Sequence, residues 1–81
     1  MNHEIIGEPI YIGEALYEII VKLIPENESE AKAVRNVEIG KANEAEKELI
    51  DNYLLFGLSG WSTLSVKSQV GTIFKLKATN I

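Results

Sequence analysis

The segment between Glu14 and Pro25 is hydrophobic at every position except Glu18 and Lys22. On a helical wheel its apolar side chains cover an arc of about 240°, and only Glu18 and Lys22 face water. This pattern predicts a helix over 14–24 that is buried on two sides and ends before the proline. The β-branched residues in the middle of the run leave a strand open as a local alternative.

Two more helical patterns follow. A polar, acidic segment leads into a thin stripe of small apolar residues, which predicts a surface helix over 28–39 that ends at Gly40. A stronger pattern covers 43–56, where Asn43 begins a capping-box analogue and the apolar face spans roughly 180° of the wheel. Gly57 then predicts a left-handed helix stop. The short connection between the two helices predicts an antiparallel pair.

The hydrophobic period changes from about 3.6 residues to about 2 after Trp61, which marks a change from helix to strand. The alternation predicts a β-hairpin with strands over 62–67 and 72–78. One side of it is apolar, and the other carries Lys67, Lys75 and Lys77. A hairpin of two strands is marginally stable alone, so it should pack on the helices or pair with another strand.

The N-terminal segment is interrupted by Gly7 and Pro9, so the longest strand expected there is a short edge strand over 10–12. The predicted fold class is therefore α+β, in a single domain over 1–81. It consists of about three helices followed by a C-terminal β-hairpin, with the helices over 14–24, 28–39 and 43–56 and the strands over 62–67 and 72–78.

Composition adds a reason to expect self-association. A chain of 81 residues buries a small fraction of its surface, and domains of this size usually gain stability from disulfides, a metal or a subunit interface. The chain has no cysteine, and its single histidine, His3, has no second soft ligand to complete a zinc site. A homo-oligomer is therefore expected, with no metal and no cofactor.

Segregation of charge is the second informative feature of the composition. Residues 1–25 carry a net charge of −3 and residues 26–51 a net charge of −4, whereas residues 57–81 carry +3. An acidic helical part thus precedes a basic tail, which could form a binding face or let neighbouring copies attract one another. Binding of double-stranded nucleic acid is disfavoured, because the helices that could enter a groove are acidic.

Localisation follows from two further patterns. The longest apolar runs are shorter than the roughly 18 residues of a membrane span. The N-terminus carries Glu4 and Glu8, where a secretory signal would have Lys or Arg. We therefore expect a soluble cytoplasmic protein that does not bind a membrane.

Motifs for catalysis are weak. The segment from Gly57 to Trp61 approaches a nucleophile elbow, but Trp61 occupies the place of the final glycine, and the segment follows a helix rather than a strand. The phosphate-binding glycine motifs are missing. The acidic side chains of the 43–56 helix are typical of a solvated surface, because a catalytic carboxylate needs a partly desolvated site. The sequence therefore predicts a protein that is not an enzyme.

Two functional hypotheses remain. The first is a homo-oligomeric binding protein, a small inhibitor or regulator that acts on a protein partner. Its candidate interface combines the predicted first helix with two helix acids: Leu16, Tyr17, Ile20, Val21, Ile24, Glu44 and Glu48.

The alternative hypothesis is sequestration of a small anionic, nucleotide-like ligand at a subunit boundary. An aromatic platform beside hydroxyl groups and lysines can stack a base and hold a phosphate. The candidate ligand-binding residues are Trp61, Ser62, Thr63, Lys67, Lys75 and Lys77. The competing interpretation of Trp61 is that it closes the hydrophobic core, as a single tryptophan in a small domain often does.

Overall fold

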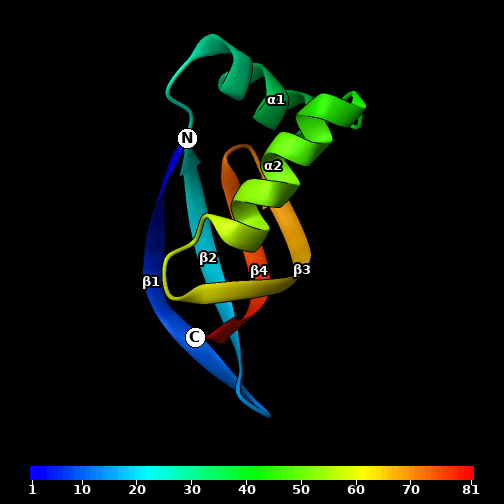
Figure 1. The fold of residues 1–81 in the computed structure, drawn as a ribbon. Helices are drawn as coiled ribbons and strands as arrows, with labels where there is room; N and C mark the ends of the chain where they lie inside the picture. Colours follow the sequence, from blue (N-terminus) through cyan, green and yellow to red (C-terminus); the bar gives the residue numbers. More distant parts are fainter.

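The computed structural model describes residues 1–81 and is a four-stranded antiparallel sheet with two helices on one of its faces (Figure 1). The strand order is β1-β2-β4-β3, so β1 and β3 form the two edges of the sheet. Helix α2 crosses the sheet, and α1 lies at its upper end (Figure 1). Along the chain the elements are β1 (Asn2–Gly13), β2 (Leu16–Ile24), α1 (Glu28–Glu38), α2 (Glu44–Phe56), β3 (Trp61–Val70) and β4 (Ile73–Asn80).

The prediction of a first helix over 14–24 is wrong, because this segment forms the central strand β2. Its odd-numbered residues face the helices, and Ile19, Val21 and Leu23 are completely or almost completely buried. The even-numbered positions point to the other face and carry both apolar and charged side chains. The helical wheel of 14–24 showed a wide apolar arc because this segment is a central strand. It has β1 on one side, β4 on the other, and helices over one of its faces.

The N-terminal strand is also longer than predicted, since β1 covers twelve residues rather than only 10–12. Gly7 and Pro9 do not end it, because they lie in an irregularity where the pairing moves from Ile6 opposite Ile20 to Ile10 opposite Glu18. An edge strand tolerates such a bulge, since one of its sides has no neighbour to pair with. The predicted α+β fold of about three helices followed by a C-terminal hairpin is thus corrected to an α+β fold with a four-stranded sheet and two helices.

The two later helices lie where the sequence places them, and the C-terminal hairpin is present with strands longer than the predicted 62–67 and 72–78. Asn43 and Glu46 form a reciprocal capping box at the start of α2, and Gly40 has a φ of +74° just after α1. The predicted left-handed stop at Gly57 is wrong, because its φ is −92°. Glycine is needed there for space, since an added Cβ would lie 2.8 Å from the backbone oxygen of Tyr53.

The core fills the layer between the sheet and the helices. Thr63 is the one buried polar residue, and its hydroxyl donates a 2.6 Å hydrogen bond to the carbonyl oxygen of Leu54 at the end of α2. Only 12 of the 81 residues are buried, and the opposite face of the sheet has no helix over it. The buried apolar residues are Ile19, Val21, Leu23, Ala33, Val34, Ile50, Leu54, Leu58, Phe74, Leu76 and Ala78.

A polar cluster joins the start of β1 to both helices. The amino group of Met1 contacts Glu26 at 2.5 Å and Glu30 at 2.7 Å, and His3 Nδ1 lies 2.6 Å from the hydroxyl of Tyr53. Hydrogen bonds to the two carboxylates raise the pKa of the amino group, and the same contact lowers the pKa of Glu30. Burial, together with the two glutamates, raises the pKa of Tyr53. This cluster fixes the N-terminus against α1 and α2.

Candidate functional site

Three aromatic rings form a row on the helix-bearing face of the sheet, at the end beyond helix α2. Tyr11 and Tyr17 are direct partners across β1 and β2, with ring centroids 5.3 Å apart. Tyr17 meets Trp61 at 5.4 Å, and both contacts are edge to face. Ala78 of β4 lies between β2 and β3 in the sheet, and its small side chain leaves room for the last two rings to meet. Edge-to-face contacts of this kind stabilise a rigid aromatic surface.

Exposure of the row increases toward the turn between β1 and β2. Tyr17 and Trp61 are partly buried, whereas 61% of Tyr11 is exposed. Its neighbours Ile10 and Ile12 are 57% and 45% exposed. We call residues 10–17 the hairpin end. Side chains alternate across a strand, so Ile10, the partner of Glu18, lies on the face opposite Tyr11, and the hairpin end is apolar on both sides. Ile12 lies at the register shift between Tyr11 and Gly13.

The turn that closes the hairpin end is made by residues that do not favour it. Glu14 and Ala15 lie between Gly13 and Leu16 and have φ angles of +55° and +63°. Positive φ at both central positions belongs to a type I′ turn, which usually contains Asn and Gly. A side chain in this left-handed region costs about 1 to 2 kcal/mol per residue. Strain of this kind persists only where the surrounding structure holds it, and it clusters at functional sites.

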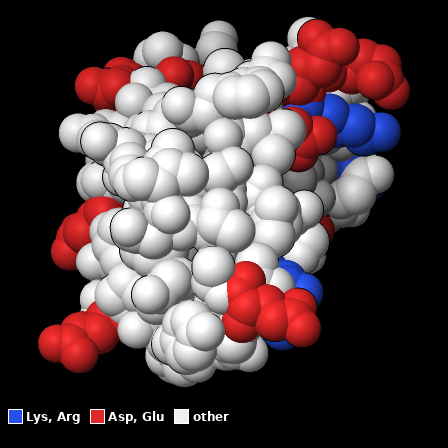
Figure 2. Space-filling view, turned by 60° about the horizontal axis from the view of Figure 1, so that its bottom comes forward, with Lys and Arg blue, Asp and Glu red and all other residues white.

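Charged residues lie around the apolar side chains of the hairpin end, and one of them, Glu14, belongs to its turn. Figure 2, which brings the lower end of the molecule forward, shows a broad surface without Lys, Arg, Asp or Glu. Most of the charged side chains at the margin of this surface are acidic (Figure 2). The arrangement suits contact with an apolar surface that has basic residues around it.

The predicted ligand-binding residues lie on two faces of the sheet. Trp61 and Thr63 face the helices, and Thr63 is bonded to α2. Ser62, Lys75 and Lys77 occupy register positions of the opposite face. On that face Glu18 lies 3.4 Å from Lys67 and 3.5 Å from Lys75. The basic tail is therefore partly neutralised by an acid of the N-terminal half within the same chain.

The predicted interface residues are also divided between environments. Leu16 and Tyr17 belong to the hairpin end, whereas Val21 is completely buried in the core. Ile20 is partly buried on the face without helices, and Ile24 is exposed at the far end of β2. The remaining two, Glu44 and Glu48, are exposed on α2.

Sequence reasoning missed Tyr11 and the pairing that makes the row. The available signal was the placement of Tyr11 and Tyr17 three residues on either side of Glu14, and the two become direct partners because the register shifts between Tyr11 and Gly13. The helical interpretation of 14–24 hid this symmetry, because it placed Tyr11 and Tyr17 in different elements.

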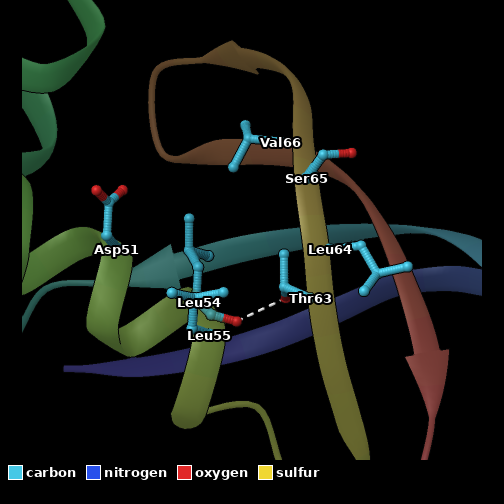
Figure 3. Close-up of a pocket in the computed structure, with 7 residues that line it drawn as sticks. All are labelled: Asp51, Leu54, Leu55, Thr63, Leu64, Ser65 and Val66. Atoms are coloured by element: carbon cyan, nitrogen blue, oxygen red, sulfur yellow. Dashed lines mark hydrogen bonds between the residues drawn. The ribbon is translucent and has the colours of Figure 1, made fainter.

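A second feature that the sequence did not indicate is a hollow between α2 and the edge strand β3 (Figure 3). Its volume is about 170 Å³. Thr63 and Val66 point from β3 toward α2, which supplies the facing wall (Figure 3). The residues that line the hollow are Asp51, Leu54, Leu55, Thr63, Leu64, Ser65 and Val66.

The structure gathers no group of three His, Cys, Asp or Glu side chains that could hold a metal ion. Neither helix has the length and apolar character needed to cross a bilayer. Comparisons with protein-family models, with curated proteins and with solved structures give no match.

Proposed function

We propose that this protein is a non-catalytic binding protein that inhibits or regulates a protein partner, and that the hairpin end is its contact surface. The observation that carries the proposal is the row of Tyr11, Tyr17 and Trp61, whose exposed end lies beside Ile10 and Ile12. Tyrosine and tryptophan are enriched among the residues that dominate protein interfaces. Contiguous exposed apolar surface is uncommon on a monomeric protein without a partner.

The charge distribution indicates which kind of partner fits. The chain has a net charge of −4, and Glu8 and Glu14 flank the apolar residues of the hairpin end. A partner with an apolar patch and surrounding Lys or Arg residues would be steered toward this surface. A protein that binds in this way acts by covering a functional surface of its partner, so it needs no catalytic group of its own.

The expectation of a homo-oligomer belongs to the same proposal. Two hairpin ends from different copies could bury their apolar side chains against each other. The acidic side chains at the margins of the two copies would repel each other and weaken this contact. The anionic-ligand alternative has no comparable support, because its aromatic and basic residues lie on opposite faces of the sheet.

Native mass spectrometry of the protein purified from its own cells tests the proposal. The informative variant is Tyr11→Ser with Ile12→Ser, in which both altered side chains are exposed, so the core is unchanged. The matched control is Ile39→Ser with Val70→Ser, which removes exposed apolar side chains elsewhere. We expect the wild type and the control to retain a protein partner or a second copy and the Tyr11/Ile12 variant to lose it.

Two results would contradict the proposal. One is a wild-type protein that is a monomer with no bound protein. The other is a partner that the Tyr11/Ile12 variant retains as well as the control does.

A further inference from the structure

The geometry points to a second binding site, at which an extended segment of a partner protein adds to the free edge of β3 and inserts one aliphatic side chain between β3 and α2. The segment that fits carries a basic side chain close to the aliphatic one. The proposal concerns the hollow of Figure 3 and is independent of the hairpin end.

Hydrogen-bonding capacity is the first argument. Strand β3 is the last strand of the sheet, so one of its sides has no neighbouring strand. The backbone of residues 64–66 makes no hydrogen bond outside the sheet. An edge strand in this state can pair with an extended peptide, and the backbone groups then provide affinity while pockets for alternate side chains provide specificity.

The shape of the site is the second argument. The register between β3 and β4 shifts between Thr63 and Ser65, so Leu64 is an extra residue without a direct partner. Bulges bend a strand and redirect its side chains, and this one lies beside the hollow. At about 170 Å³ the hollow is smaller than the roughly 300 Å³ at which small-molecule sites begin, and it suits one side chain.

Charge identifies the occupant. Asp51 lines the hollow, and Glu48 is exposed one turn earlier on α2. Neither carboxylate forms an ion pair, and Lys67 of β3 is engaged with Glu18. An apolar floor beside unpaired acids is complementary to an aliphatic side chain flanked by Lys or Arg. The acidic hairpin end of a second copy is a poorer match for the same reason.

Fluorescence polarisation with synthetic peptides of about eight residues, the length of an ordinary strand, tests this site. The probe alternates Val and Lys, and a control peptide alternates Val and Glu. We expect the Val-Lys peptide to bind the wild-type protein, with an affinity that falls as salt is added. The Val-Glu peptide should not bind.

Backbone pairing is tested by methylating alternate peptide nitrogens, which should abolish binding if the peptide forms a strand on β3. Equal binding of the methylated peptide would overturn the assignment.

Variants locate the site on the protein. Asp51→Lys should weaken binding of the Val-Lys peptide about five- to tenfold, since it replaces an attraction by a repulsion. Glu4→Lys is the matched control, because it makes the same charge change at an exposed acid on the opposite edge of the sheet, away from the hairpin end, and it should leave the affinity unchanged. Leu55→Ser removes an exposed apolar side chain from the hollow and should also weaken binding.

Two results would contradict the location or the occupant. Equal effects of Asp51→Lys and Glu4→Lys would show attraction to net charge rather than a site. In the other, light scattering shows that the wild type forms dimers, that Leu55→Ser loses them, and that the peptide does not bind. The hollow would then be covered by a second copy, and the proposal would be overturned.

Discussion

Gly57 shows how one residue can be required for space rather than for backbone handedness. It follows α2 with a φ of −92°, which any residue can adopt. An added Cβ would nevertheless lie 2.8 Å from a ring carbon and 2.8 Å from the carbonyl oxygen of Tyr53. The ring of Tyr53 cannot move away freely, because its hydroxyl contacts His3 at 2.6 Å.

We expect Gly57→Ala to lower the free energy of unfolding by about 1 to 3 kcal/mol, the usual cost of overpacking. Urea unfolding measured by tryptophan fluorescence checks this value. Ser59→Ala, at an exposed position in the same loop, should change stability by less than about 0.5 kcal/mol. Similar stabilities for both variants would contradict the steric argument.

At the scale of elements, β2 explains which part of the fold the sequence could predict. Helices α1 and α2 have local signals, such as the Asn43 and Glu46 capping box, and both lie where these signals place them. Strand β2 has no such signal. Glu18 and Lys22 are four residues apart, so they share a face on a helix and also on a strand. The choice between the two is made by pairing with β1, which directly precedes β2, and with β4, which lies at the other end of the chain.

The candidate sites were less predictable than the helices. The aromatic row needs Tyr11, Tyr17 and Trp61 to come together from three strands, and the hollow needs α2 to lie beside β3. Both depend on the strand order. A sequence pattern reports which face a side chain occupies within its element, but it does not report which element lies next to it.

The turn at the hairpin end gives a prediction at this scale. Glu14→Asn with Ala15→Gly should raise the free energy of unfolding by about 1 kcal/mol, because both new residues tolerate positive φ. Urea unfolding measures the change. The control Ala45→Gly makes a similar substitution in helix α2 and should lower stability by about 0.5 to 1 kcal/mol. A decrease in the turn variant would show that the turn is not strained.

The whole molecule is held at its upper end by charge as well as by apolar contact. The amino group of Met1 reaches Glu26 and Glu30, and the backbone N–H of Gly71 donates to the carboxylate of Glu38. Gln69 of β3 donates to the carbonyl oxygen of Val34 at 3.2 Å. These polar contacts fix α1 against the end of the sheet.

The free energy of unfolding should therefore fall at low pH and at high pH. Glu30 has a pKa below its ordinary value, so its contribution is present above about pH 4.5 and is lost as pH falls through the lowered native pKa. The amino group of Met1 has a raised pKa, so its contribution is complete below about pH 8 and is lost as pH rises through the raised native pKa.

Urea midpoints measured from about pH 3 to pH 10 test this dependence. Glu30→Gln should reduce the loss of stability at both limits, because it removes one member of the ion pair. Glu28→Gln, which alters a neighbouring exposed acid without an ion pair, should keep the wild-type profile. Identical profiles for all three proteins would show that the cluster does not contribute.

The unfavourable turn between β1 and β2 also bears on the order of folding. A hairpin usually forms early when its turn residues favour closure, because the loop is short. Here closure is opposed locally, so we expect β2 to pair first with β4, its distant neighbour, and β1 to join last. Long-range pairing of this kind slows folding. During that interval β2 would present an open edge, and the newly made chain would be most prone to pair with other chains before β1 covers it.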